Sequence, residues 1–136
     1  MPEFPHLLHT AIDTTDGRGL AEFYREFLGL RYRPGDEPPT EGSEDDDSWL
    51  VLVDDDGNRK IAVQRVYSLP RSTWPGHEVP MQLHIDFSVS SRDELERQKE
   101  RAIALGATVL LDRTGEPEAL YVLADPAGHP FCILTR

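Results

Sequence analysis

The segment Gln82-Leu83-His84-Ile85-Asp86-Phe87-Ser88-Val89 alternates polar and apolar residues without a break. This period of two residues is typical of a β-strand with one buried face and one polar face. His84 and Asp86 belong to the polar set, so we expect both side chains to point away from the helix that covers the apolar face. The segment therefore predicts a strand that carries two titratable groups outside the hydrophobic core.

A helix is predicted directly after this strand. Ser91 and Glu94 have the spacing of a capping box, in which the serine side chain accepts a hydrogen bond from a backbone N–H of the first helical turn. The helical pattern continues to Leu105, and Gly106 is the residue type that commonly ends a helix. The apolar positions of this pattern include Leu95, Ala102 and Ile103.

The same order of elements occurs once earlier in the chain. A strand is predicted over Leu7–Thr14 with His9 on its polar face, and a helix with an apolar stripe begins near Leu20. Leu20 follows His9, and Leu95 follows His84, by the same 11 positions. Two copies with a period this long indicate a duplicated module rather than a solenoid.

The second part of each module repeats as well, because Val51–Gly57 matches Val122–Gly128 in its apolar strand and acidic turn. We therefore predict an α+β fold of two tandem βαβββ modules, which form a curved mixed sheet with helices on the outer face and a concave cup. A single domain would span residues 1–136. The first module covers about 6–66, a connector covers 67–80, and the second module covers about 81–136.

Composition limits the classes of partner. The chain has 136 residues, a formal net charge of −11 and a pI near 4.7, so it lacks the basic surface that binds nucleic acid or an anionic membrane. No apolar run approaches the about 20 residues that cross a bilayer. The single cysteine, Cys132, excludes an intrachain disulfide and is consistent with a reducing compartment. We expect a cytoplasmic protein.

Two segments differ from the rest in composition. Pro34–Ser48 combines proline, glycine and acidic residues without any aliphatic side chain, which predicts a solvated, mobile loop, with a lid over a neighbouring site as the functional alternative. Tyr67–Pro80 contains several prolines and predicts an extended connector. Trp74 in this connector is expected to pack against the domain or a second subunit.

Polar residues from four strands are predicted to share the concave face. If the apolar residues of each strand face a helix, then His9, Gln64, His84 and Cys132 lie on the other side, and the two histidines converge there. Asp86 would lie beside His84, either as a general base or as a group that orients the imidazole. His84 and Asp86 are therefore the candidate catalytic residues.

These features resemble the vicinal oxygen chelate superfamily, which contains glyoxalases, bleomycin-resistance proteins and extradiol dioxygenases. The resemblance rests on the duplicated module, the histidine in the first strand of each half, and Asp125-Pro126-Ala127-Gly128 before the last strand. It covers nearly the whole chain. The run His84-Ile85-Asp86 and the ending through Cys132 are similar to a small glyoxalase-like branch of the superfamily.

The resemblance implies a metal site at His9, Gln64, His84 and the position of Cys132, where metal-using members usually have glutamate. Without that carboxylate the set lacks a ligand that hard cations require. Zinc, in contrast, accepts imidazole and thiolate ligands. A divalent metal (Zn, Mn, Ni or Fe) and a metal-free polar cup are both interpretations of this set.

The resemblance implies three functions for such a cup. The first is a glyoxalase-like lyase, isomerase or dioxygenase whose metal, held by His9 and His84, polarises oxygens of a small substrate. The second is a metal-free protein that binds a drug or metabolite without turnover. The third is a fold that persists without chemistry. The predicted ligand-binding residues are His9, Gln64, His84, Asp86, Cys132 and Trp49, with Trp74 and Tyr121 as further aromatic candidates.

The resemblance also implies a homodimer. Members of this length commonly pair because the cup is completed by another module, and we expect Trp74 and the connector near the interface.

Overall fold

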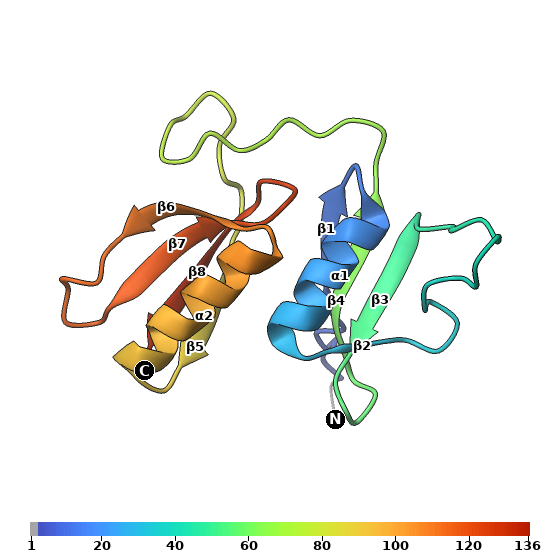
Figure 1. The fold of residues 1–136 in the computed structure, drawn as a ribbon, viewed down its shortest axis with the longest axis horizontal. Helices are drawn as coiled ribbons and strands as arrows, with labels where there is room; N and C mark the ends of the chain where they lie inside the picture. Colours follow the sequence, from blue (N-terminus) through green and yellow to red (C-terminus); the bar gives the residue numbers. More distant parts are fainter. Residues whose placement is uncertain (1–2) are drawn as a thin grey trace. The chain divides into compact units, whose positions relative to one another are not determined.

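The computed structural model describes residues 3–136, which form two compact units that divide between Ser68 and Leu69. Each unit contains one helix and one four-stranded mixed sheet, and the helix lies along one face of its own sheet (Figure 1). The predicted pair of βαβββ modules is confirmed. Residues 69–80 of the connector cluster with the second unit.

The first unit has the strand order β1-β4-β3-β2. Strand β1 pairs in parallel with β4, whereas β3 pairs antiparallel with both β4 and β2. The turn Asp54–Asn58 joins β3 and β4, and the Asp54 N–H donates to the Asn58 carbonyl at 2.9 Å. The elements are β1 (Thr10–Thr14), α1 (Gly17–Leu28), β2 (Arg31–Tyr32), β3 (Trp49–Val53) and β4 (Arg59–Arg65).

The second unit repeats this topology with the strand order β5-β8-β7-β6. Strand β5 pairs in parallel with β8, and β7 pairs antiparallel with both β8 and β6. The duplication visible in the sequence is therefore a duplication of topology. The elements are β5 (Ile85–Val89), α2 (Arg92–Leu105), β6 (Thr108–Asp112), β7 (Leu120–Ala124) and β8 (Pro130–Thr135).

Local signals explain the limits of α1. The Asp16 side chain accepts a hydrogen bond from the Gly19 N–H at the N-terminus, and Gly29 ends the helix in the left-handed conformation at φ 66°. The apolar stripe of α1 is buried against β3 and β4 and provides the helical part of the core of the first unit. Its buried members are Leu20, Ala21, Phe23, Tyr24 and Phe27.

Helix α2 begins as predicted, because Ser91 caps it and accepts a hydrogen bond from the Glu94 N–H. Leu95 and Ala102 are buried. The prediction that Ile103 belongs to the apolar stripe is wrong, since its side chain is 40% exposed. Ile103 is adjacent in sequence to Ala102, and neighbouring helix positions are about 100° apart, so it turns toward solvent.

Strands β1 and β5 begin later than predicted, at Thr10 and Ile85 rather than at Leu7 and Gln82. Both predicted site histidines therefore precede a strand by one residue. For β5 the reason is chemical, because Ile85 pairs with Phe131 and the next position along β8 is Pro130, which has no N–H to donate. Each histidine therefore lies just before the first residue of its strand and is not itself part of the sheet.

The acidic loop Pro34–Ser48 is tied to the first unit by arginines. Arg18 donates to both carboxylate oxygens of Asp45, at 2.8 and 2.7 Å, and to the carbonyl of Asp36 at 2.7 Å. Asp47 accepts from the Arg18 backbone N–H at 3.0 Å and pairs with Arg65. A side chain at Gly17 would collide with the Asp47 carbonyl, so the loop approaches α1 closely. Most residues of the loop are exposed, as predicted, and these contacts attach it to the unit at Asp36, Asp45 and Asp47.

Within residues 3–136 no helix is both long and apolar enough to cross a membrane.

Candidate functional site

The face of the first sheet opposite α1 carries a row of polar and aromatic side chains. Strand pairing places Asp13 beside Gln64, and Gln64 beside Trp49, across three neighbouring strands. The next row consists of small or aliphatic residues, Ala11, Ala62 and Val51. Because alternate residues of a strand share a face, both rows lie on the side away from the helix.

His9 and Trp49 contact each other across the second row. Their ring centroids are 5.7 Å apart and the rings are tilted by 57°. Trp49 lies two residues before Val51 along β3, and His9 lies two residues before Ala11. Because β1 and β3 run in opposite directions, the two rings lie on opposite sides of the row of Ala11, Ala62 and Val51, and their contact crosses that row. Val51, Val53 and Ala62 form a buried apolar cluster on this face. Trp49 itself is 37% exposed.

The surroundings of His9 favour the neutral form of its imidazole. Burial, and then the positive charges of Arg59 and Arg33, lower its pKa below the ordinary value of 6.5. Nδ1 is buried and has no hydrogen-bond partner among the described residues. A neutral imidazole with a buried nitrogen can pack through the flat, apolar face of its ring.

The open face of the second sheet carries His84, Asp86 and Cys132. The parallel register of β5 and β8 places Asp86 opposite Cys132. His84 Nε2 lies 3.2 Å from Asp86 Oδ1. One ligand atom from each of the three residues lies within 4.8 Å of the other two, so the group could hold a metal ion.

The Cys132 side chain is half-buried. Without a bound cation its thiol keeps its proton at neutral pH. Burial, followed by the negative charge of Asp86 and a hydrogen bond with it, raises its pKa to about 11. The thiol is therefore a poor nucleophile at neutral pH in the metal-free protein, because the thiolate is the reactive form.

Tyr121 is not a candidate for the open face, contrary to our expectation. Its hydroxyl donates to Glu96 of α2, and the ammonium of Lys99 lies 5.1 Å from the centre of its ring. Tyr121 therefore faces the helix. Trp74 is half-buried in the connector and donates through its backbone N–H to Ser72 at 3.2 Å.

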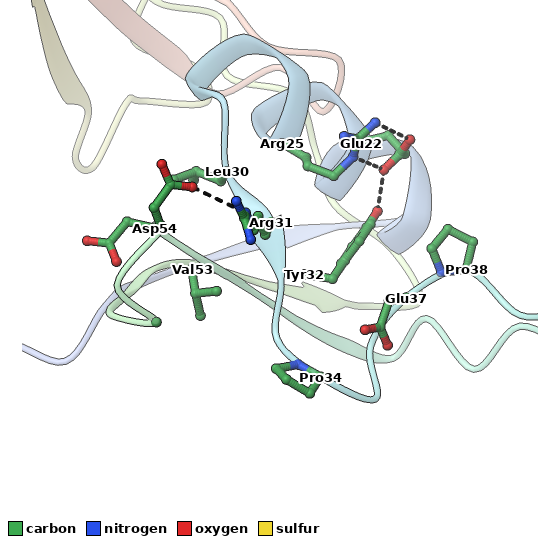
Figure 2. Close-up of a pocket in the computed structure, with 12 residues that line it drawn as sticks. Glu22, Arg25, Leu30, Arg31, Tyr32, Pro34, Glu37, Pro38, Val53 and Asp54 are labelled. Atoms are coloured by element: carbon green, nitrogen blue, oxygen red, sulfur yellow. Dashed lines mark hydrogen bonds and ion pairs between the residues drawn. The ribbon is translucent and has the colours of Figure 1, made fainter.

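A shallow cavity of about 610 Å³ lies elsewhere on the first unit, between the end of α1, β2 and the β3–β4 turn (Figure 2). Five of its polar side chains bind one another. Glu22 accepts from Arg25 and from the Tyr32 hydroxyl, both at 2.6 Å, and Arg31 pairs with Asp55 at 3.2 Å. The cavity contains none of the predicted site residues, so it is separate from the open sheet face.

The predicted site residues gather in two groups. His9, Gln64 and Trp49 lie on the open face of the first sheet, and the other three on the open face of the second. The convergence of His9 with His84 on one ligand stays a prediction. Asp13, which alternation in the first strand places on the same face as His9, lies in the Gln64 row. Arg18, the anchor of the acidic loop, is a residue that the site prediction missed, because nothing local indicates its partner.

Comparison with known proteins places this arrangement in a class. The profile of the family described as a glyoxalase-like domain matches residues 9–134. The chain belongs to this glyoxalase-like family of the vicinal oxygen chelate superfamily. No curated protein matches the sequence.

Several solved structures share the fold over nearly the full chain. A fosfomycin resistance protein, FosX, from Listeria monocytogenes matches with a TM-score of 0.67 at 17% identity, over 98% of this chain and 95% of that one. A glyoxalase/bleomycin resistance protein/dioxygenase family enzyme from Burkholderia phytofirmans matches at 0.65 and 20% identity, over 94% and 96%. A possible glyoxalase from Bacillus cereus matches at 0.63 and 16%, over 95% and 97%. At these identities the likeness establishes the fold.

Proposed function

We propose that this glyoxalase-like protein binds a small organic molecule on the open face of its first sheet. The observation that carries the proposal is the contact between Trp49 and His9 above the buried cluster of Val51, Val53 and Ala62. Aromatic side chains over an apolar floor, with a few polar groups beside them, are the usual composition of a small-molecule site. This proposal corresponds to the metal-free alternative of the sequence analysis.

Each residue of this face would have a defined role. Trp49 offers an exposed indole surface for stacking on a flat or apolar body. Gln64, beside it in the register, has both a donor and an acceptor in its amide. Asp13 adds an acceptor in the same row. The arrangement favours a ligand with an apolar body and a polar oxygen- or nitrogen-bearing edge.

The relatives support the class of ligand. Structures with this fold include proteins described as conferring fosfomycin or bleomycin resistance. A drug or a metabolite of similar size is therefore the first class of compound to test.

A metal-dependent lyase, isomerase or dioxygenase is the second candidate. The set implied by the family does not fit a hard cation here, because Gln64 is a neutral amide and Cys132 replaces the usual carboxylate. A histidine that binds a metal usually donates its other ring N–H to a partner, and His9 Nδ1 has none among the described residues. The observation that favours a metal is the separate group of His84, Asp86 and Cys132.

We also propose a homodimer. Tyr67, at the start of the connector, is fully exposed, and Leu83, three residues after its end, is 66% exposed. Large apolar side chains left exposed are candidates for a surface that another chain covers. Light scattering after size exclusion should give twice the mass of 15.4 kDa. A stable monomer at micromolar concentration would contradict the dimer.

Tryptophan fluorescence tests the binding proposal. The chain has two tryptophans, so W74F leaves Trp49 as the only one. A compound library is first screened by thermal shift, where a ligand at 100 times its Kd adds about 2.7 kcal/mol to the free energy of unfolding. A true ligand should change Trp49 emission in W74F and lose affinity in W49A. Hits that bind W49A as tightly as the unmodified protein would overturn the proposed site.

A further inference from the structure

We propose that the second unit binds one zinc ion through His84, Asp86 and Cys132, independently of His9 and Gln64. This inference does not rest on the ligand site of the first sheet. It also differs from the metal set implied by the family, because Asp86 becomes a ligand and the first unit contributes none.

The backbone already brings the three side chains together. Asp86 and Cys132 are paired neighbours on β5 and β8, and His84 lies two residues before Asp86, on the same side of the chain. Their ligand atoms lie within 4.8 Å of one another. Zinc binds nitrogen, oxygen and sulfur at about 2.0–2.3 Å, so modest rotation of the side chains brings all three to one ion.

Solvent exposure permits that rotation. The side chains of His84 and Asp86 are 38% and 57% exposed, whereas Cys132 is fixed within a central strand of the sheet. The two mobile ligands can therefore close on an ion held against the sulfur. The exposed side of the group would leave a fourth position for water or for a ligand oxygen, as in sites that are not purely structural.

The three ligand atoms favour zinc over magnesium and manganese. One imidazole, one carboxylate and one thiolate match the preferences of Zn²⁺. Mg²⁺ and Mn²⁺ prefer oxygen ligands and gain little from sulfur. On binding, the Cys132 S–H bond breaks, the proton leaves to solvent, and the sulfur electron pair forms the bond to zinc. No oxidant or reductant is required.

Cobalt substitution tests the site directly. Co²⁺ takes zinc positions, and a thiolate ligand gives a sulfur-to-cobalt charge-transfer band in the near ultraviolet. Protein without a histidine tag is stripped with a chelator and titrated with Co²⁺ and then with Zn²⁺. We expect one equivalent of Co²⁺, a charge-transfer band, and displacement by one equivalent of Zn²⁺. Absence of the band in the unmodified protein would overturn the proposal.

Single substitutions identify the ligands. The band should disappear in C132S, and Co²⁺ affinity should fall by at least about tenfold in H84A and in D86N. H9A and Q64A should bind Co²⁺ as the unmodified protein does. H77A is the matched control for weak binding by an exposed histidine. Loss of binding in H9A or Q64A would assign the metal to the family set instead, and unchanged binding in D86N would remove Asp86.

Two controls separate this result from other failures. Circular dichroism of each variant shows whether a lost band reflects a lost ligand or a lost fold. A variant that fails to fold is replaced by another substitution at the same position, C132A, H84N or D86S. The Trp49 fluorescence titration is run with a chelator present, so failure of the zinc site and failure of the small-molecule site give different outcomes.

Discussion

Trp49 and His9 meet over the open face of the first sheet with ring centroids 5.7 Å apart, although 40 positions of sequence separate them. The row between them contains only small or aliphatic side chains, Ala11, Ala62 and Val51, across which the two rings can approach each other. The contact places the His9 ring, which can gain a proton, beside the Trp49 ring, which fluoresces.

This contact predicts a pH signal. A protonated imidazole quenches a neighbouring indole, so Trp49 emission in W74F should fall as His9 gains a proton. Because burial lowers the pKa of His9, the midpoint should lie below 6.5. The same shift means that the unfolded chain binds the proton more tightly, so stability decreases as pH falls from 6.5 toward the folded pKa. A midpoint at or above 6.5, or the same titration in H9N, would contradict this.

Arg18 is expected to hold the acidic loop. R18A removes two hydrogen bonds to Asp45 and one to the Asp36 carbonyl, and the free energy of unfolding should fall by about 1 kcal/mol because the pair is partly exposed. Limited proteolysis should cut within Pro34–Ser48 faster than in the unmodified protein. The matched control is R97A, whose ion pair with Glu94 is well exposed and whose loss should leave cleavage unchanged.

The same anchor should weaken in acid. The hydrogen bond from Arg18 lowers the pKa of Asp45 below its ordinary 3.8, so the pair stabilises the fold above that value. The contribution is lost as pH falls through the folded pKa of Asp45. Proteolysis with an acid protease should therefore accelerate with falling pH in the unmodified protein and depend less on pH at this loop in R18A, where only the Asp47 contacts remain.

Two leucine-sized side chains of α2 should differ sharply in their contribution to stability. Leu95 is 1% exposed and Ile103 is 40% exposed. L95A should lower the free energy of unfolding by about 2–5 kcal/mol, since it leaves a cavity in the core of the second unit. I103A should cost less than about 1 kcal/mol. Urea denaturation of both variants checks this, and equal losses would place Ile103 in the core.

The Cys132 thiol should react slowly in metal-free protein. With a pKa of about 11, its thiolate fraction at pH 8 is about one hundredth of that of a thiol with the ordinary value of 9.0. Alkylation in the presence of a chelator should accelerate in D86N, because the charge of Asp86 contributes to the shift. Unfolded protein gives the reference rate. A native rate equal to the unfolded one would contradict the shift.

Much of the fold follows from periodicity. Alternation around His84 and Asp86 identifies the polar face correctly, and the repeat of the His9 segment predicts the second module. The alternation fails at Ala119–Leu123, where every residue is apolar or aromatic. Strand β7 lies inside its sheet and is buried on both faces, so no polar residue marks which side faces the helix. The prediction that Tyr121 lies on the open face is wrong for this reason.

The site was only partly predictable for a different reason. Asp86 and Cys132 lie 46 positions apart, and their pairing depends on the parallel register of β5 and β8, which no local signal specifies. Arg18 reaches Asp45 across 27 positions through a loop without regular structure. Long-range pairs of this kind depend on which distant segments come together when the chain folds. No short segment of the sequence specifies this.

The loop that Arg18 holds ends one residue before Trp49, and the Ser48 carbonyl accepts from the Arg65 N–H at 3.0 Å, where β3 begins. Ionic contacts of Arg18 and Arg65 therefore hold Asp45 and Asp47, a few residues before Trp49. Added salt screens such ionic contacts. It should therefore change the affinity for an uncharged ligand, although salt does not screen any charge on that ligand.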